Sequence, residues 1–352
     1  MIERKKTRTV TVRNVKIGYG HPVSIQSMVK TDIRDASSTI KQVQQIEEAG
    51  CEIVRVAIKD MDSAKMISSI KKEVTIPIVA DIHFDYKLAI EAISQGADKI
   101  RINPGNISSF EKIDKIIDAA SSKNVPIRIG VNSGSLTEGA GSDAMVSSAL
   151  KYIEHFQKRN FHELVISVKS AEVPATISAY RKISAECDYP LHLGITAAGL
   201  PAEGIIRSSI GIGTLLMEGI GDTIRVSLTG DPLREVDTAR KILSATGMRN
   251  FGPQIISCPT CGRCEVDLVS IVEKLDHELK LLTTHYSLLT DKQFLIAIMG
   301  CEVNGPGEAK NADIGIAFGS GKGAIFKHGQ VIKTVSEDSA ISELLGIIKE
   351  KL

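Results

Sequence analysis

Four of the six cysteines lie in two short segments of the last third of the chain. The first reads Ser257-Cys-Pro-Thr-Cys-Gly-Arg-Cys264, and the second contains Cys301 in Gly300-Cys-Glu-Val-Asn-Gly-Pro-Gly-Glu308. Thiolates grouped in loops rich in Gly and Pro are typical of metal and iron–sulfur centres. The spacing of Cys258, Cys261 and Cys264, with Cys301 as a distant fourth thiol, predicts an iron–sulfur cluster. A closed, tetrahedral zinc site is the alternative.

Glu308 adds an oxygen ligand to this set of sulfur ligands. It follows Cys301 in a glycine-containing loop that could bring its carboxylate to the same site. A hard oxygen donor among soft thiolates would bind one iron weakly and leave it exchangeable. This favours a catalytic cluster over a simple electron relay.

A second set of chemically competent residues occurs earlier, at alternate positions of predicted strands. Side chains at alternate positions share one face of a strand. In a barrel that face is normally filled by branched apolar side chains, but here it carries polar ones. They are Arg55, Asp81 and His83, Arg101 and Asn103, Arg128 and Asn132, Ser167 and Lys169, His192 and Thr196, and Arg225 and Ser227.

Five of these side chains are cations, with few acids beside them: Arg55, Arg101, Arg128, Lys169 and Arg225. Cations that converge on one mouth cannot neutralise one another and need a polyanion, such as a diphosphate. The alternative is that each arginine points outward between helices and pairs with Asp or Glu. Either histidine, His83 or His192, could also be a structural residue without a catalytic role.

The strand pattern predicts a β/α barrel over residues 1–245 that binds the diphosphate. Eight short apolar runs, each followed by a helical pattern, are typical of a (β/α)8 TIM-type fold. The strands are expected at 23–28, 52–58, 77–83, 99–103, 126–132, 164–169, 191–196 and 222–228. Related stretches that begin at Gly50, Gly96 and Gly221 place a helix-ending glycine before a strand that contains an arginine.

Residues 246–352 are predicted to form a small α+β domain that carries the cluster. Strands are expected at 254–257, 294–299, 314–318 and 323–333, and helices at 266–282 and 336–350. A polar connector over 246–253 separates the two domains.

The composition sets limits on partners and location. The net charge of +1 provides no basic field, so nucleic acid is not expected as a partner. No apolar run reaches the roughly 18 residues of a membrane helix, and the N-terminal segment does not resemble a signal peptide. We therefore expect a cytoplasmic protein. Cys51 and Cys187 stand alone and are expected to pack in the core.

Several motifs together resemble those of the bacterial 4-hydroxy-3-methylbut-2-en-1-yl diphosphate synthase family, the iron–sulfur enzymes of the methylerythritol phosphate route to isoprenoids. Besides the two cysteine segments, they are Val79-Ala-Asp-Ile-His-Phe-Asp85, Arg101-Ile-Asn-Pro-Gly-Asn106 and Arg128-Ile-Gly-Val-Asn132. The resemblance extends over essentially the whole chain and corresponds to the shorter, two-domain form of the family.

This resemblance implies a reaction and a set of roles. The substrate would be 2-C-methyl-D-erythritol 2,4-cyclodiphosphate. It would be opened and dehydroxylated with two electrons from reduced flavodoxin or ferredoxin through a [4Fe–4S] cluster. Cys258, Cys261, Cys301 and Glu308 correspond to the cluster ligands of the family. Glu308 would give way to the substrate oxygen, and Glu218 corresponds to an acidic residue of the barrel mouth.

Two positions depart from the family pattern. Cys264 is an additional thiol, so a cluster with four cysteine ligands is an alternative to one that uses Glu308. Ala197 stands in Gly194-Ile-Thr-Ala-Ala-Gly199 where many members carry glutamate.

The order of the two domains predicts a homodimer with composite sites. The last barrel helix, expected over 233–245, should deliver the chain to the end of the barrel opposite the mouth. The cluster of one subunit would therefore serve the mouth of another, as the family also suggests. The competing functions are a non-catalytic metabolite-binding barrel with a zinc-stabilised domain and a pterin-binding-type transferase. A radical S-adenosylmethionine enzyme would need a different cysteine spacing.

Overall fold

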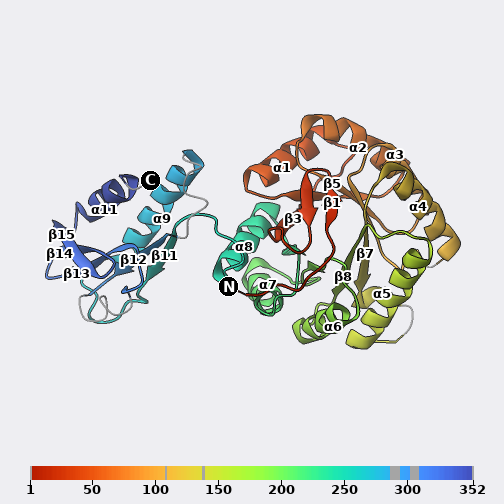
Figure 1. Ribbon diagram of the computed structural model, residues 1–352. Helices are drawn as coiled ribbons and strands as arrows, with labels where there is room; N and C mark the ends of the chain where they lie inside the picture. The colour runs from red at the N-terminus through yellow and green to blue at the C-terminus, as the bar shows by residue number, and fades with distance from the viewer. Residues whose placement is uncertain (1, 108, 137–138, 286–293, 302–308, 351–352) are drawn as a thin grey trace. The chain divides into compact units, whose positions relative to one another are not determined.

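The computed structural model describes residues 2–107, 109–136, 139–285, 294–301 and 309–350 (Figure 1). The chain divides into two compact units, Met1–Arg249 and Asn250–Leu352. Among the described residues, no helix combines the length and the apolar character needed to cross a bilayer.

The first unit is built on eight parallel strands in the spatial order β8-β7-β6-β5-β4-β3-β10-β9. Their bounds are β3 (Ser24–Met28), β4 (Ile53–Ile58), β5 (Ile78–Ile82), β6 (Lys99–Ile102), β7 (Ile127–Asn132), β8 (Leu164–Lys169), β9 (His192–Leu193) and β10 (Thr223–Ile224). A parallel bridge between Ile166 and Leu191 joins the two edges of the sheet. The sheet therefore closes, and the predicted TIM-type barrel is confirmed.

Eight helices surround these strands (Figure 1). They are α1 (Ala36–Glu48), α2 (Met61–Glu73), α3 (Tyr86–Ser94), α4 (Phe110–Lys123), α5 (Gly141–Lys158), α6 (Val173–Glu186), α7 (Pro201–Met217) and α8 (Pro232–Ala245). The side chains of Asp35, Asp60 and Asp231 accept hydrogen bonds from backbone N–H groups at the starts of α1, α2 and α8. Each helix returns the chain to the N-terminal ends of the strands, here called the floor. The opposite end is called the mouth.

An N-terminal hairpin that the sequence did not predict closes the floor. Its strands β1 (Val10–Val12) and β2 (Val15–Ile17) pair antiparallel. Val12 and Ile17 are fully buried against Ile53 and Val79 of the barrel strands. Three-residue strands are too short to produce a recognisable alternation, but their apolar side chains exclude water from the lower end of the barrel.

The second unit contains a five-stranded sheet in the order β11-β12-β13-β14-β15. The elements are β11 (Gln254–Ser257), β12 (Leu295–Met299), β13 (Ile314–Gly319), β14 (Lys322–Lys327), β15 (Gln330–Ser336), α9 (Leu268–His285) and α11 (Ala340–Lys349). β11, β12 and β13 run parallel, whereas β14 and β15 pair antiparallel. Leu275 and Leu344 of the two helices share a buried cluster with Ile298 and Ile316 of the sheet.

One predicted strand of this unit is wrong. The single strand expected over 323–333 is a hairpin of β14 and β15. His328 and Gly329 at its tip both have positive φ, 46° and 78°. Two successive residues of this kind form the tight turn that suits the twist of a hairpin. The sequence pattern continues on both sides of this turn, which concealed the reversal.

Candidate functional site

Three predicted site residues lie at one level inside the barrel. Asp81, Arg101 and Arg128 are in register on neighbouring strands β5, β6 and β7. Arg101 Nη1 lies 3.1 Å from Asp81 Oδ1, and Arg55 Nε lies 3.7 Å from Asp81 Oδ2. Burial would raise the pKa of Asp81. Arg55, then His83 and Arg101, outweigh this effect and hold that pKa well below its usual value.

Arg128 and His192 are buried without hydrogen-bond partners for most of their polar atoms. Arg128 Nε and Nη1 and both ring nitrogens of His192 have none. Burial, followed by the neighbouring cations, lowers the pKa of each side chain well below its usual value. Buried polar groups are normally paired, so these two point to a ligand that supplies acceptors and negative charge.

Two glycines make room for the cations. A Cβ atom on Gly130 would lie 2.7 Å from Arg101 Nε, and one on Gly194 would lie 2.6 Å from Lys169 Nζ. Lys169 Nζ donates to Leu193 O at 3.4 Å, and Lys169 is in register with Asn132 at the mouth end of β7 and β8. Burial and then the surrounding arginines lower the pKa of Lys169 well below its usual value. The backbone is thus shaped for buried cations.

Glu235 is a site residue that sequence analysis missed. It lies in the first turn of α8 and is 1% exposed. Its carboxylate accepts from Arg225 Nη2 at 3.3 Å, from Lys30 Nζ at 2.8 Å and from Ser27 Oγ at 3.1 Å. Burial, then Arg55, lower the pKa of Arg225 to about 10 against the opposing effect of Glu235. The sequence signal that could have predicted this role is the position of Glu235 shortly after the last barrel strand, whose carboxyl end lies at the mouth.

The remaining predicted ligands occupy loops at the mouth. Asn103 Nδ2 donates to Ser135 Oγ at 2.9 Å. His83 is about half exposed, and its Nε2 lies 3.4 Å from Asp81 Oδ2. Ser227 is partly buried in the segment after β10. Ala197 has a left-handed φ of 48° in the loop after β9.

The predicted position of Glu218 at the barrel mouth is wrong. Glu218 follows directly after α7, at the floor end of that helix. Its Oε2 accepts from Arg181 Nε of α6 at 2.9 Å on the outer surface. That hydrogen bond, opposed by slight burial, lowers the pKa of Glu218. The family resemblance suggested the mouth, but the direction of α7 carries this residue to the other end.

The four thiols of the cysteine segments lie at one end of the second sheet. Ser257 of β11 is in register with Ile298 of β12, so Cys258 and Cys301 follow the same ends of parallel strands. Gly300 N–H donates to Cys258 Sγ at 3.3 Å. A Cβ atom on Gly300 would lie 2.4 Å from Cys264 Sγ and 3.4 Å from Cys258 Sγ. Cys261 is exposed.

The donor chemistry and the topology of this region fit an iron–sulfur centre. Within the described residues, no group of three or more His, Cys, Asp or Glu side chains forms a metal site. Glu308 lies outside those residues. The single cysteines contribute nothing here. Cys51 is buried, as predicted, and burial raises its pKa to about 12. Cys187 is only partly buried, which departs from the prediction, and burial raises its pKa as well.

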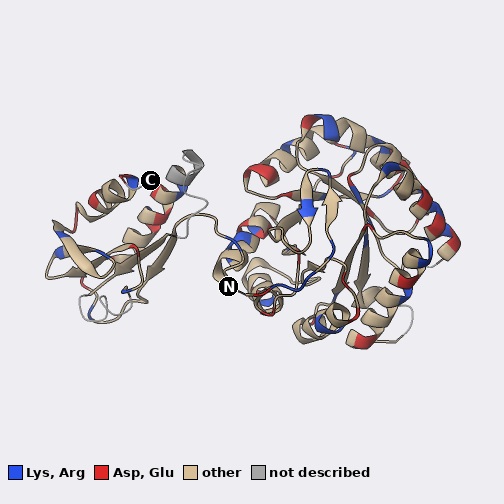
Figure 2. Cartoon of the chain, viewed as in Figure 1, with Lys and Arg blue, Asp and Glu red and all other residues tan. Residues whose placement is uncertain are grey.

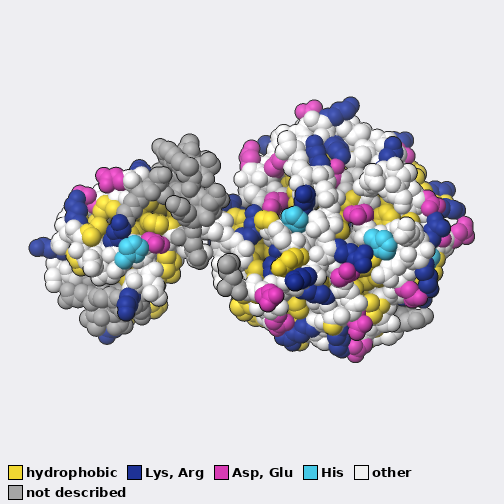
Figure 3. All heavy atoms as spheres, viewed as in Figure 1, with side chains coloured by type: hydrophobic (Ala, Val, Ile, Leu, Met, Phe, Trp, Pro, Cys, Tyr) yellow, Lys and Arg dark blue, Asp and Glu magenta, His cyan; other side chains and the backbone are white. Residues whose placement is uncertain are grey.

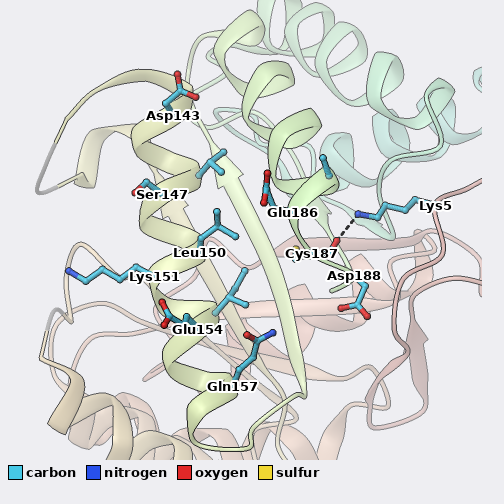
Figure 4. A pocket seen from close by; sticks show the side chains of 13 residues that line it. Lys5, Asp143, Ser147, Leu150, Lys151, Glu154, Gln157, Glu186, Cys187 and Asp188 are labelled. Carbon is cyan, nitrogen blue, oxygen red and sulfur yellow. Dashed lines mark hydrogen bonds between the residues drawn. The ribbon is translucent and has the colours of Figure 1, made fainter.

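On the face of the barrel that Figure 3 shows, the described charged side chains of the outer surface are of both signs. Acidic and basic side chains alternate along the outer helices, and both mix with apolar ones on the visible face (Figures 2 and 3). A hollow of about 920 Å³ between α5 and α6 is lined by Lys5, Lys151, Glu154 and Asp188, among others (Figure 4). Lys5 Nζ donates there to Cys187 O. The mixed charges of this hollow do not favour an anion.

Two family models match the chain in succession. One, described as the GcpE TIM-barrel domain, matches residues 7–240, and the other, described as the GcpE protein C-terminal domain, matches residues 254–350. The 4-hydroxy-3-methylbut-2-en-1-yl diphosphate synthase (flavodoxin) of Clostridium perfringens is 50% identical over 355 residues, covering 99% of this chain and 99% of the relative. Its namesake from Caldanaerobacter subterraneus is 51% identical over 354 residues, covering 99% of this chain and 98% of the relative.

Among solved structures, the dihydropteroate synthase of Xanthomonas albilineans in complex with 7,8-dihydropteroate is similar with a TM-score of 0.51. It is 13% identical and covers 68% of this chain and 98% of its own. At this identity the likeness concerns the barrel fold alone.

Proposed function

The chain belongs to the GcpE family, whose relatives compared above are 4-hydroxy-3-methylbut-2-en-1-yl diphosphate synthases, and from this membership we propose the reaction and the roles of its residues. The family resemblance seen in the sequence is confirmed. The reaction is the two-electron reductive ring opening and dehydroxylation of 2-C-methyl-D-erythritol 2,4-cyclodiphosphate to 4-hydroxy-3-methylbut-2-en-1-yl diphosphate. The electron donor is reduced flavodoxin, as the names of the relatives suggest, and ferredoxin remains an alternative.

The observation that carries the proposal is the excess of buried cations in the barrel. Arg128 and His192 lack acceptors, and Asp81 already serves Arg55 and Arg101. A cyclic diphosphate brings two negative charges and several acceptor oxygens into this space. Arg128 and Lys169 would bind the phosphates, because both are buried and, among the described contacts, neither pairs with a carboxylate. Asp81 would orient Arg55 and Arg101, and Glu235 would orient Arg225.

The second unit would hold a [4Fe–4S] cluster through Cys258, Cys261, Cys301 and Glu308. When bound, the cluster would supply single electrons and a Lewis-acidic iron for the substrate oxygen. Gly300 supports this assignment because it brings a backbone N–H to Cys258 Sγ and, lacking a Cβ atom, lets the sulfurs of Cys258 and Cys264 lie close to its backbone. Cys264 packs beside Cys258 and is the alternative ligand if Glu308 does not bind.

The composite homodimer is supported by where the chain leaves the barrel. Arg249 Nη1 donates to Val23 O at 3.1 Å and pairs with Glu52 at 2.6 Å. Val23 and Glu52 precede β3 and β4, so this anchor lies at the floor. Residues 250–253 can span at most about 14 Å, whereas a six-residue strand is roughly 20 Å long. A second copy is therefore the simpler source of the cluster for each mouth.

An apolar stripe on α7 supports the same dimer. Ile206, Ile210 and Met217 are 60%, 53% and 59% exposed at helical spacing on one outer face. Contiguous exposed apolar surface of this kind usually marks a protein interface, and a two-fold axis would pair the stripe with itself. The stripe belongs to the barrel unit, so it could join two barrels whatever the second unit does.

Anaerobic turnover tests the function. Protein reconstituted with iron and sulfide should convert the cyclodiphosphate when supplied with reduced flavodoxin, and it should lose activity and visible absorption together after chelation. A colourless, zinc-stoichiometric protein that binds the cyclodiphosphate without converting it would instead support the binding module. Repeating the assay with reduced ferredoxin in place of reduced flavodoxin, and comparing the two turnover rates, identifies the electron donor.

Subunit mixing tests the composite site. Cys258→Ala protein and Arg128→Met protein are each expected to be inactive. After exchange of subunits, half of the molecules carry one intact site of two, so about a quarter of the wild-type activity should return. Exchange confirmed by mass spectrometry without any recovery would contradict the composite site. A mixture of two Arg128→Met preparations is the control.

A further inference from the structure

Lys99 is a fully buried lysine at the floor end of β6 that the roles above do not use. It is 0% exposed, and its Nζ atom has no hydrogen-bond partner. It is in register with Val79 of β5, so both side chains lie on the interior face of the barrel. Val79 packs against Val12 and Ile17 of the floor hairpin. Lys99 thus lies between an apolar floor and the cations above it.

The charged groups around Lys99 are almost all positive. Arg128 of β7 and Arg55 of β4 act on it directly, and His192 of β9 is influenced by both Lys99 and Lys169 of β8. Asp81 of β5 and Arg101, on the same strand as Lys99, already pair with each other. Burial, then Arg128 and Arg55, lower the pKa of Lys99 well below its usual value. Without an anion, this environment favours the neutral amine.

The cyclic diphosphate changes this balance without titrating itself. Each phosphorus of the ring is bonded to one bridging oxygen and one ester oxygen, so each keeps a single, strongly acidic oxygen. The substrate is therefore a dianion throughout the neutral range, and any proton taken up on binding belongs to the protein. Ring opening then frees one more phosphate oxygen, so the product is more negative than the substrate.

We propose that Lys99 takes up a proton when the cyclic diphosphate binds, so that substrate binding and charging of this buried amine are coupled. The amine lone pair accepts a proton from a solution acid, whose conjugate base stays in solution. Lys99 becomes a positioning cation beneath Arg128 and is already charged when ring opening adds negative charge. This inference rests on the proposed function, because it requires the cyclic diphosphate as the ligand.

Calorimetric titration of the reconstituted protein with the cyclodiphosphate, without reductant, measures the coupling. Repeating the titration near pH 8 in buffers of different ionisation enthalpy gives the protons taken up per substrate. The wild type should take up about one proton more than Lys99→Met. Its dissociation constant should also increase about tenfold more per pH unit than that of the variant.

Two further variants keep the test decisive. Lys99→Arg retains a permanent charge, so it should bind the substrate without the proton uptake seen in the wild type. Lys71→Met is the matched control, because Lys71 pairs with Asp98 at 2.6 Å outside the interior, and its proton uptake should equal that of the wild type.

The outcomes separate this inference from the function on which it rests. Tight binding with equal proton uptake in the wild type, Lys99→Met and Lys99→Arg would overturn the role of Lys99 and leave the proposed function intact. Absence of saturable binding by the wild type would overturn both. If Lys99→Met does not fold, the comparison of the wild type with Lys99→Arg decides alone.

Discussion

The barrel and the C-terminal sheet both place reactive side chains at the ends of parallel strands, but they prepare them differently. In the barrel, Arg101 and Arg128 lie on adjacent strands in register and are buried. In the C-terminal sheet, Cys258 and Cys301 follow adjacent parallel strands but lie in loops, and Cys261 is exposed. The cations are held by a rigid sheet, whereas the thiols are held by connections between elements.

This difference indicates which partner organises each site. Inside the barrel, the sheet fixes the cations in place and leaves buried charge without acceptors, so the proposed ligand would complete a site that the protein has already formed. In the C-terminal sheet, the described thiols form no closed set. There the cofactor would gather its own ligands, as metals commonly do in small domains. The buried cations should therefore lower the stability of the barrel while raising its affinity for an anion, whereas the second unit should gain stability from its cofactor.

The largest expected effect comes from removing a thiol. Cys258→Ala should lower reductive turnover by roughly 100-fold or more, because losing a direct ligand exceeds the usual effect of disturbing a neighbouring group. It should also lower bound iron and the unfolding temperature of the second unit. Iron analysis, visible absorption and thermal unfolding under argon measure these changes. Cys51→Ala, which removes a buried thiol from the barrel, is the control and should leave the iron content unchanged.

The next effect separates affinity from stability in the barrel. Arg128→Met should weaken binding of the cyclodiphosphate by about 2–4 kcal/mol, because it removes a buried charge from an anion. The same change should raise the free energy of unfolding by about 1–3 kcal/mol, because it removes a buried cation that lacks acceptors. Equilibrium binding and urea unfolding measure the two quantities.

The outer arginine Arg181 provides the control for Arg128. Arg181→Met removes an exposed partner of Glu218 and should change stability by less than about 1 kcal/mol. Its substrate affinity should equal that of the wild type. A loss of stability in Arg128→Met would show that its guanidinium is already satisfied without a ligand, and the contrast between the two regions would fail.

The sequence predicted the parts of the molecule where one physical rule dominates. Alternate polar side chains on buried strands identified Asp81, Arg101 and Lys169, because the pleat fixes which side chains share a face. Grouped cysteines predict the second site, because only a few structures use thiols at this spacing, and that site stays a prediction. The family resemblance added the identity of the substrate to these two predictions.

The sequence failed to predict the roles of residues whose local pattern fits both a buried and an exposed position. Lys99 lies two residues before Arg101, which would place both side chains on the same face of the strand. A lysine directly after Gly96-Ala-Asp98 is, however, also typical of the exposed first residue of a strand. Glu235 occupies the first turn of a helix, where acids are common because of the helix dipole. Only the closed barrel shows that Lys99 and Glu235 are buried. The family resemblance alone places Glu218 at the mouth, whereas α7 runs from the mouth to the floor and ends beside this residue.

A smaller effect should appear in the pH dependence of stability. The folded state holds Lys99 with a lowered pKa, so the unfolded chain binds more protons at pH values between that lowered pKa and the ordinary lysine value of about 10.4. Stability should therefore rise with pH through that range, by at most about 1.4 kcal/mol per pH unit for this group. Lys99→Met should show a shallower slope in urea unfolding at several pH values. Parallel slopes in the wild type and the variant would mean that Lys99 is charged in the ligand-free barrel.

The smallest effect is expected at Glu218, and it contrasts the floor with the mouth of the same barrel. Glu218→Gln removes one partner of an exposed ion pair at the end of α7, which should cost less than about 1 kcal/mol of stability. Turnover should stay within about twofold of the wild type, since no described contact links this side chain to the interior cations.

Glu235→Gln is the matched change at the mouth. It weakens the hold on Arg225 and Lys30 and should raise KM for the cyclodiphosphate by about tenfold or more, because hydrogen bonds to charged groups contribute about 1.5–3 kcal/mol. Steady-state kinetics of the two variants, measured side by side, test this assignment. A larger loss of turnover or a larger rise in KM in Glu218→Gln than in Glu235→Gln would contradict it.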